Sequence, residues 1–386
     1  MMRPARGFPA AEFEARTRAA QTLMAEAGLS ALLLTTEPEV RYYTGFLTRF
    51  WESPTRPWFV VVPQKGAPIA VIPSIGAHLM GQTWVTDIRT WQAPDYNDDG
   101  IGLLAETIAE VTPVDGRIGM ADQMESFARM PLGDLDVLKA RLGTRALTSD
   151  ATITRRLRLV KSEAEIAKIR AAAQIADRAF DRVGDIAAVG TPQSQVFRLF
   201  QMLCLEEGAD WVPYLAGAAA QGGYGDVISP ASDAPLAQGD VLMLDTGLVW
   251  DGYFCDFDRN FAVGDVDPAV DRGHRKLIEA TEAGFASAQV GAKISDLFHG
   301  MSGVVNSGDA QMDAGRFGHG LGMQLTEWPS IIPQDHTELS AGMVLTLEPC
   351  VGLGGGKIMV HEENIIITDQ GPEYLSRPQT SAIRVI

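Results

Sequence analysis

Residues 244–261 read LDTGLVWDGYFCDFDRNF, and this stretch governs how the rest of the chain is interpreted. Its leucine, valine and aromatic residues are typical of buried strands, yet four aspartates interrupt them: Asp245, Asp251, Asp256 and Asp258. A buried carboxylate without a partner costs several kcal/mol or takes up a proton. The stretch therefore predicts either a bound cation or a strand face that is open to solvent.

The middle of this stretch has the signature of a hairpin. Asp251 and Gly252 separate two apolar runs, and both residue types tolerate the positive φ of a two-residue turn. With that turn as the loop, Asp245 lies opposite Asp258, and paired residues share a face of the sheet. Four residues are then expected on one face: Asp245, Gly247, Asp256 and Asp258. Carboxylates this close repel one another unless a cation lies among them, although a solvated outer face stays open on this stretch alone.

The composition of the chain excludes several classes of protein. The 386 residues are 46% hydrophobic and 21% charged, which is typical of a folded globular protein. A net charge of −17 with no offsetting basic stretch argues against nucleic-acid binding. No apolar run reaches the roughly 18 residues of a membrane span, so no membrane partner is expected.

Cysteine usage and the first residues of the chain indicate a compartment. Three cysteines without framework spacing predict a reducing environment: Cys204, Cys255 and Cys350. Residues 1–29 form a charged, alanine-rich helical pattern that lacks the apolar segment of a signal peptide. These features predict a cytoplasmic protein.

The order of helix-like and strand-like segments predicts two domains. Helical and strand patterns alternate in the first part, which predicts a small α/β domain over residues 1–150. Ser162 and Glu165 then form a capping box at the start of a long helix, which opens a second domain over residues 151–386. Further helices are expected near 192–207 and 268–289, with strands towards the end. The fold class is therefore α/β, in the broad sense that includes α+β.

Three motifs beyond the hairpin add residues that bind metals. These are GHGLG (318–322), with one histidine among glycines, and two expected strands, MVLTLEPC (343–350) and VHEENIIIT (360–368). They carry His319, Glu348, Glu362 and Glu363. Each motif by itself favours a structural interpretation, as a packed histidine or as glutamates at a strand edge.

Taken together, the motifs resemble one known family in order and spacing. The sequence is similar to the superfamily of creatinase, prolidase, aminopeptidase P and methionine aminopeptidase, whose catalytic domain has the pita-bread fold. RYYTGF (41–46) and LVKSEAEIAKIRAAA (159–173) extend the resemblance along nearly the whole chain. It implies a creatinase-like N-terminal α/β domain followed by a pita-bread C-terminal domain.

The resemblance also implies a set of metal ligands. Asp256 follows Asp245 by eleven residues, as in the family, and the full set is Asp245, Asp256, His319, Glu348 and Glu362. Glu362 is preferred to Glu363 because it precedes Thr368 by six residues, as the family ligand precedes its threonine. By resemblance, Asp256 and Glu362 bridge two cations, Asp245 chelates one, and His319 and Glu348 hold the other.

This ligand set implies a dinuclear metallohydrolase. Carboxylates with one imidazole suit two divalent ions of Mn, Co, Fe or Zn, and two such ions activate a bridging hydroxide. The implied enzyme is an Xaa-Pro aminopeptidase or dipeptidase, and its partner is a short peptide or another small molecule.

The sequence also departs from the family pattern. The peptidases carry a histidine seventeen residues before the first aspartate, where this chain has Ile228, and another seven residues after the ligand histidine, where it has Thr326. Asp258 stands where the family usually has threonine. Without the two imidazoles, an alternative is the same fold acting on a small zwitterionic or polar compound that is not a peptide. A binding protein without catalysis is less favoured, because all five metal ligands are present.

Several residues are candidates for the remaining roles. Glu348, Thr326 and Tyr224 are proposed as catalytic, although Tyr224 is equally consistent with a surface loop. Asp258 and Glu327 are expected beside the metal ligands, His361 on the opposite strand face, and Cys350 as inert packing. The segment FLTRFWESPTRPW (46–58) is expected to bind substrate in the partner chain of a homodimer, through Arg49, Trp51 and Arg56.

Overall fold

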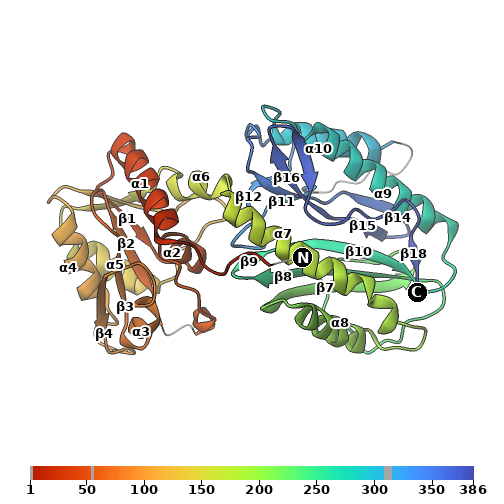
Figure 1. Cartoon of the computed structure of the whole chain (residues 1–386), viewed down its shortest axis with the longest axis horizontal. Coiled ribbons are helices and arrows are strands. Elements are labelled where there is room, and N and C mark those ends of the chain that lie inside the picture. Colours follow the sequence, from red (N-terminus) through yellow and green to blue (C-terminus); the bar gives the residue numbers. More distant parts are fainter. Residues whose placement is uncertain (1–2, 54–55, 308–314) are drawn as a thin grey trace. The chain divides into compact units, whose positions relative to one another are not determined.

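The computed structural model describes residues 3–53, 56–307 and 315–386, and these form two compact units (Figure 1). One unit is Ala5–Arg158, and the other is Leu159–Ile386 together with Arg3 and Pro4. The predicted fold class, an α/β unit followed by a mixed helix and strand unit, is confirmed.

A mixed sheet forms the centre of the N-terminal unit. Within the described residues its strand order is β4-β3-β2-β1-β5-β6. The strands are β1 (Ala31–Leu34), β2 (Phe59–Pro63), β3 (Ile69–Pro73), β4 (Asp87–Trp91), β5 (Arg117–Met120) and β6 (Ala146–Ser149). The hairpin predicted from the two apolar runs at 58–63 and 68–73 is confirmed by the antiparallel pairing of β2 with β3. Continuous apolar runs are expected here because helices cover the sheet.

Helices surround this sheet and supply the other side of its core. The longer ones are α1 (Ala10–Ala27), α2 (Glu37–Thr44), α4 (Ile101–Val111) and α5 (Leu132–Arg141), and short ones are η1 (Phe50–Glu52), η2 (Ser74–Gly76), α3 (Ala77–Met80) and α6 (Ile153–Leu159). α1 ends at Gly28, whose φ of 65° is the left-handed conformation that stops a helix. Leu104 and Ile108 of α4 lie in one buried cluster with Val61 and Ile118 of the sheet.

The C-terminal unit begins with the long helix α7 (Glu163–Asp181). The predicted capping box is confirmed: the Ser162 hydroxyl accepts from the Glu165 backbone N–H, and Glu165 accepts from the Ser162 backbone N–H. α7 and α8 (Gln193–Glu207) pack on the sheet formed by β7 (Trp211–Gln221) and β8 (Asp240–Trp250). Short helix η3 (Val183–Asp185) links the two helices.

The hairpin at residues 244–261 forms as the sequence predicts. Asp251 and Gly252 make the turn with φ values of 48° and 80°, and β8 then pairs with β9 (Tyr253–Phe254) and β10 (Phe257–Ala262). Asp245 lies directly opposite Asp258. The sheet continues from β10 to β18 (Arg384–Val385).

A second sheet completes the C-terminal unit. Its order is β12-β11-β13-β16-β17, from β11 (His319–Gly320), β12 (Glu327–Ser330), β13 (Val344–Leu347), β16 (Glu363–Thr368) and β17 (Gly371–Tyr374). Helices α9 (Pro268–Ser287) and α10 (Ile294–Val305) pack on each other, and α9 also packs on β13 and the hairpin β14 (Cys350–Gly354) and β15 (Lys357–Val360). In Figure 1, α7 and α8 lie with β7 and β8, while α9 and α10 lie with the later strands.

One strand differs from its prediction. The strand expected over 360–368 is interrupted, because β15 ends at Val360 and β16 begins at Glu363. His361 and Glu362 lie in the gap, where the chain leaves its pairing with β14 and enters the pairing with β13. The break frees the two side chains from strict alternation across a sheet.

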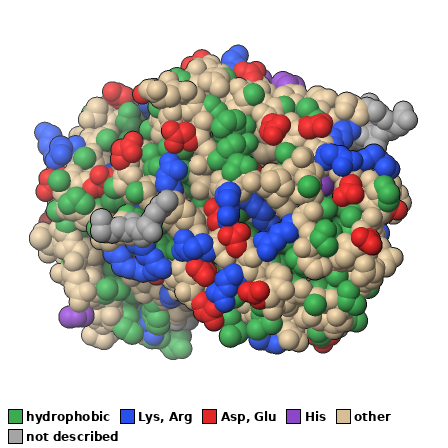
Figure 2. Space-filling view, turned by 45° about the vertical axis from the view of Figure 1, so that its right-hand side comes forward, with side chains coloured by type: hydrophobic (Ala, Val, Ile, Leu, Met, Phe, Trp, Pro, Cys, Tyr) green, Lys and Arg blue, Asp and Glu red, His purple; other side chains and the backbone are tan. Residues whose placement is uncertain are grey.

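Charges are dispersed over the surface. On the face drawn in Figure 2, lysine and arginine side chains are interspersed with aspartate and glutamate. Arg178 and Arg182 of the C-terminal unit, for example, both pair with Glu207. Among the residues that the structure describes, no helix combines the length and the apolar character needed to cross a membrane.

Candidate metal centre

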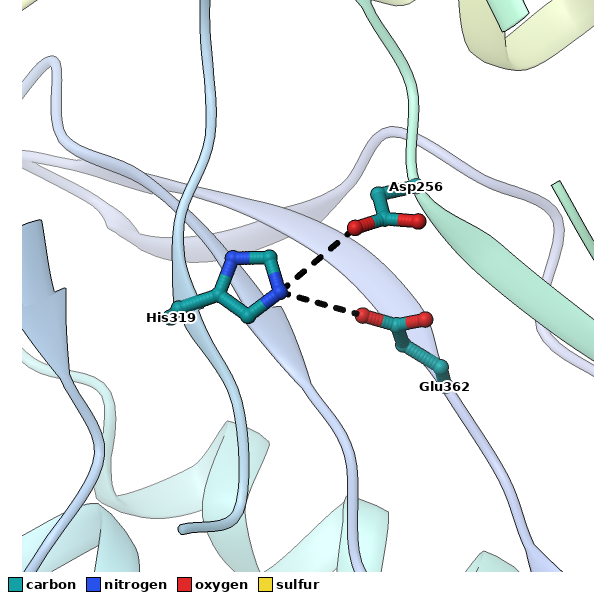
Figure 3. A group of neighbouring side chains, drawn as sticks. All are labelled: Asp256, His319 and Glu362. Atoms are coloured by element: carbon teal, nitrogen blue, oxygen red, sulfur yellow. Dashed lines mark ion pairs between the residues drawn. The ribbon is translucent and has the colours of Figure 1, made fainter. Parts of the chain in front are cut away.

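Three buried side chains from distant parts of the sequence meet between the two sheets of the C-terminal unit. The Nε2 atom of His319 lies 3.5 Å from Asp256 Oδ2 and 4.0 Å from Glu362 Oε1 (Figure 3). Ligand atoms of all three residues lie within 4.8 Å of one another. A metal ion needs several donor atoms around one point, and this group provides them.

The glycines beside His319 let its backbone approach its neighbours closely. A Cβ atom on Gly318 would lie 2.2 Å from the Thr346 carbonyl oxygen, and one on Gly320 would lie 2.4 Å from that of Trp328. The backbone N–H of His319 donates to Thr346 Oγ1 at 3.1 Å. The GHG motif is therefore required by the backbone packing of β11 between β12 and β13.

His319 is held as a neutral ligand with a defined tautomer. Its Nδ1 atom lies 2.8 Å from the Gly320 carbonyl oxygen, so the ring proton resides on Nδ1 and Nε2 presents a lone pair to the acids. Burial, with a smaller effect of Arg316, lowers the pKa of His319 to about 4. The imidazole is thus free of a second proton at neutral pH, as metal binding requires.

Asp256 is positioned by an asparagine from the other sheet. The Asn364 side chain accepts from the Asp256 backbone N–H at 3.0 Å and donates to the Asp256 carbonyl oxygen. Asn364 is in β16, two residues beyond Glu362, so this contact sets the start of β10 beside Glu362. Both backbone groups of Asp256 are satisfied, which leaves its carboxylate free to face His319.

The site carries more negative charge than the protein neutralises. Burial and mutual repulsion raise the pKa values of Asp245, Asp256 and Glu362 well above their usual range. Burial and Asp258 raise the pKa of Glu348 to about 7. Among the described residues, Asp245 Oδ1, Asp256 Oδ1 and Glu362 Oε1 are buried without a hydrogen-bond partner. Buried acceptors of this kind indicate that a cation belongs there.

Asp245 and Glu348 lie beside the compact group but are not part of it. Asp245 is buried and Glu348 is half-buried, and their charges act on Asp256 and Glu362. The structure thus brings all five predicted ligands into one electrostatic cluster, with Asp256, His319 and Glu362 as its tightest part.

Two residues of the site escaped the sequence analysis. The Tyr214 side chain hydrogen-bonds with Asp245, and its pKa is raised by burial and by the acids nearby. Arg316 is exposed, and its positive charge opposes the rise of the pKa values of Asp256 and Glu348. Tyr214 pairs with Gly247 across the sheet, and Ala216, two residues further along β7, pairs with Asp245. Residues two apart share a face of the sheet, so the register of β7 was the signal that would have found Tyr214.

Thr326 ends the turn between β11 and β12, and Glu327 is the first residue of β12. Glu327 is buried, forms an ion pair with Lys161 at 3.2 Å, and accepts from the backbone N–H groups of Met323 and Gln324. Thr326 is half-buried at the end of this turn. Glu327 therefore fixes the turn on which Thr326 stands.

The contacts of Tyr224 argue against the proton-donor role suggested for it. Its hydroxyl donates to Asn260 Oδ1 at 3.1 Å and accepts from the Val360 backbone N–H at 2.7 Å. At 1% exposure it is a core residue, so the surface-loop interpretation is also wrong. Ile228, in contrast, is 80% exposed.

Residues around 49–58 pack mostly within their own unit. Trp51 is buried against Trp58. The Arg129 guanidinium lies 5.3 Å from the Trp51 ring and donates a hydrogen bond to the Trp51 carbonyl oxygen. Arg49 is exposed and pairs with Glu52. The burial of Trp51 argues against its predicted contact with substrate in a partner chain. Arg56 is half-buried, and residues 54 and 55 lie outside the described residues.

Cys350 fits its prediction as packing. It is 8% exposed, and burial raises the pKa of its thiol to about 12. A thiol that stays protonated is a poor nucleophile.

Comparison with known proteins identifies the family. The model of metallopeptidase family M24 matches residues 167–369, and the creatinase/prolidase N-terminal domain matches residues 16–160. The chain belongs to metallopeptidase family M24. The M24 chain is therefore a metallohydrolase, and the resemblance seen in its motifs is confirmed.

Relatives of the M24 chain extend over nearly its whole length. The probable dipeptidase PepE of Mycobacterium tuberculosis is 29% identical over 381 residues, 95% of each chain. The Xaa-Pro dipeptidase of Pyrococcus horikoshii is 27% identical over 66% of this chain and 73% of its own. The crystal structure of dipeptidase PepE from Mycobacterium ulcerans has a TM-score of 0.83 at 25% identity, covering 98% of this chain and 99% of its own.

The residues of the site fit the divalent metal that family M24 implies. Carboxylate oxygens without protein partners and one neutral imidazole nitrogen form a donor set that Mn²⁺, Co²⁺, Fe²⁺ or Zn²⁺ accepts. The fit rests on the side chains themselves, because among the described residues Asp245 Oδ1, Asp256 Oδ1 and Glu362 Oε1 have no hydrogen-bond partner.

Replacing Asp256 tests the centre directly. Asp256→Asn preserves the shape of the side chain and removes one carboxylate from the group of Asp256, His319 and Glu362. The remaining carboxylates would then neutralise less of the positive charge of the bound cations. We expect metal content per chain to fall and hydrolysis to disappear while the circular dichroism spectrum is unchanged. Elemental analysis after dialysis gives the metal content. Two ions retained in Asp256→Asn would show that the ligand assignment is wrong.

The metal-free protein should lose stability as pH rises above about 6.5. The pKa of Glu348 is near 7 in the folded state against 4.5 when unfolded, so the folded state holds the proton more tightly and stability falls as that proton leaves. His274 and His319, with pKa values lowered to about 4, change stability only below about 6.5. Thermal unfolding in chelator at about pH 6.5 and about pH 8.5 measures the loss.

Cations provide the control for this measurement. With saturating Mn²⁺ the carboxyls are already deprotonated, so the decline in stability over the same interval should shrink. A metal-free protein whose stability rises across the interval would contradict the assigned protonation of the site.

Proposed function

We propose that this M24 chain hydrolyses dipeptides, with Xaa-Pro peptides as the leading substrate class, and that it does so with two divalent cations. The buried group of Asp256, His319 and Glu362, with unpartnered carboxylate oxygens, carries the proposal. The names of the mycobacterial and archaeal relatives support a dipeptide as the substrate.

The five acidic and histidine ligands divide naturally between two cations. By the family resemblance, Asp256 and Glu362 would serve both cations, while Asp245 would serve one and His319 with Glu348 the other. Bound divalent cations would supply a nucleophile at neutral pH and polarise the scissile carbonyl. Four carboxylates and a neutral imidazole balance the charge of two such ions.

Other groups of the chain would handle the substrate and its protons. Glu348 is also proposed as catalytic, because a carboxylate beside the cations can take up a proton and return it to the leaving amine. Tyr214 orients Asp245 through their hydrogen bond. Thr326 stands on a turn fixed by Glu327 and can donate a hydrogen bond to a developing oxyanion.

A small zwitterionic compound is the second candidate substrate. Thr326 replaces one imidazole of the peptidases, and at the position of the other the chain has Ile228, which is 80% exposed. Neither residue can carry positive charge beside the reacting carbonyl. A substrate with a better leaving group than an amide needs less of this stabilisation.

Xaa-Pro peptides are therefore expected to be cleaved slowly. Loss of one oriented oxyanion donor lowers the rate by about 10²–10³ in a well-studied hydrolase. We expect kcat/KM for Xaa-Pro dipeptides below about 10⁴ M⁻¹s⁻¹, and faster turnover of at least one member of a panel of small zwitterions. Assays use protein reconstituted with Mn²⁺, Co²⁺, Fe²⁺ or Zn²⁺, with Asp256→Asn as the inactive control. Efficient cleavage of Xaa-Pro peptides would contradict this expectation and assign the histidines' role to Thr326 and its neighbours.

We also propose that the protein is a homodimer in which residues 49–58 of one chain border the metal centre of the other. Arg49 and Phe50 are exposed in this segment, which supports a contact there, whereas Trp51 is buried and contributes only to its shape. Light scattering at micromolar concentration should give the mass of two chains. A fully active monomer would refute the assembly.

We also propose a cytoplasmic location, because all three cysteines are free and buried.

A further inference from the structure

Asp258 is a buried carboxylate that none of the roles above uses. It lies on β10 directly opposite Asp245 on β8, so the two side chains share the face that carries the metal centre. Its side chain is 1% exposed, and among the described residues neither of its oxygens has a hydrogen-bond partner. A fully buried carboxylate with two unused oxygens is costly unless something positive contacts it.

The His361 imidazole approaches one oxygen of Asp258. His361 Nδ1 lies 3.6 Å from Asp258 Oδ1, and His361 Nε2 lies 3.2 Å from Glu363 Oε1. Glu363 is itself held by Arg259 at 3.0 Å and by the Gln379 backbone N–H at 3.0 Å. The imidazole is thus anchored at its far end and faces Asp258 with the other nitrogen.

Among the described residues, the remaining neighbours supply no hydrogen-bond donor to either oxygen of Asp258. The Tyr224 hydroxyl is occupied by Asn260 and Val360, and the Cys350 thiol is a weak donor. Asp245, across the ladder, adds repulsion in place of support. The side of Asp258 that faces Asp245 is therefore the side that lacks positive charge.

We propose that Asp258 is a further anionic ligand for the cation held by Asp245, and that His361 orients its carboxylate. The inference rests on the proposed metal centre and goes beyond the five ligands that the family resemblance implies. A fifth carboxylate makes the donor set harder and more negative, which favours oxygen-preferring cations such as Mn²⁺ over Zn²⁺. The carboxylate–histidine–carboxylate chain through Glu363 resembles the arrangements that fix ligands around metals in general.

The test is a titration of chelator-stripped protein with Mn²⁺, followed by calorimetry and elemental analysis. In Asp258→Asn we expect the affinity for one of the two cations to fall between about 10-fold and 100-fold, the range seen when groups that support a metal site are removed. His361→Gln should weaken the same cation by a smaller factor, because the carboxylate remains but is less well oriented. Asp369→Asn, which removes an exposed carboxylate in the turn before β17, is the matched control and should bind as the wild type does.

Unfolding in chelator separates a ligand from a structural ion pair. A ligand that is unpaired without metal repels Asp245, so Asp258→Asn should be at least as stable as the wild type in chelator and should gain less stability from Mn²⁺. The proposal is overturned if Asp258→Asn binds Mn²⁺ as tightly as the control, or if it loses stability in chelator with its Mn²⁺ affinity unchanged. A wild-type protein that binds fewer than two cations would instead count against the proposed dinuclear function. The two failures are therefore distinguishable.

Discussion

The mutual repulsion of buried carboxylates is the constraint on which the C-terminal unit depends. Asp245, Asp256 and Glu362 are nearly inaccessible to water, and burial together with their proximity raises the pKa of each. Such a group is tolerated only when protonated or when a cation lies within it. The same repulsion that destabilises the metal-free protein is the source of its affinity for divalent ions, because the ions replace protons at the same oxygens.

The backbone around the centre is built to hold these acids against their repulsion. Asn364 clamps the Asp256 backbone, and glycines flanking His319 let β11 approach its neighbours within distances that a side chain would block. Glu327, paired with Lys161, fixes the turn after β11. Each contact joins segments that lie far apart in the sequence, so the site is a property of the two sheets together and not of any one motif.

Prediction from the sequence succeeded where a local pattern had one physical interpretation. The turn at Asp251 and Gly252, the capping box at Ser162 and the register that pairs Asp245 with Asp258 all follow from short-range geometry. It failed where burial is decided by distant segments. Tyr224 and Trp51 have amphipathic side chains that suit a surface or a core equally well, and only their neighbours place them in the core.

The sequence by itself determined the family and the two-domain α/β class, and it supplied the candidate set of metal ligands, because spacing and residue type carry that information. The tertiary structure alone decided which donors are neutral or anionic and which lack partners, since pKa values and hydrogen bonds depend on what surrounds each group. His361 shows the difference. Its position in the chain predicts only that it lies next to Glu362, whereas the break between β15 and β16 and the anchor at Glu363 turn its ring towards Asp258.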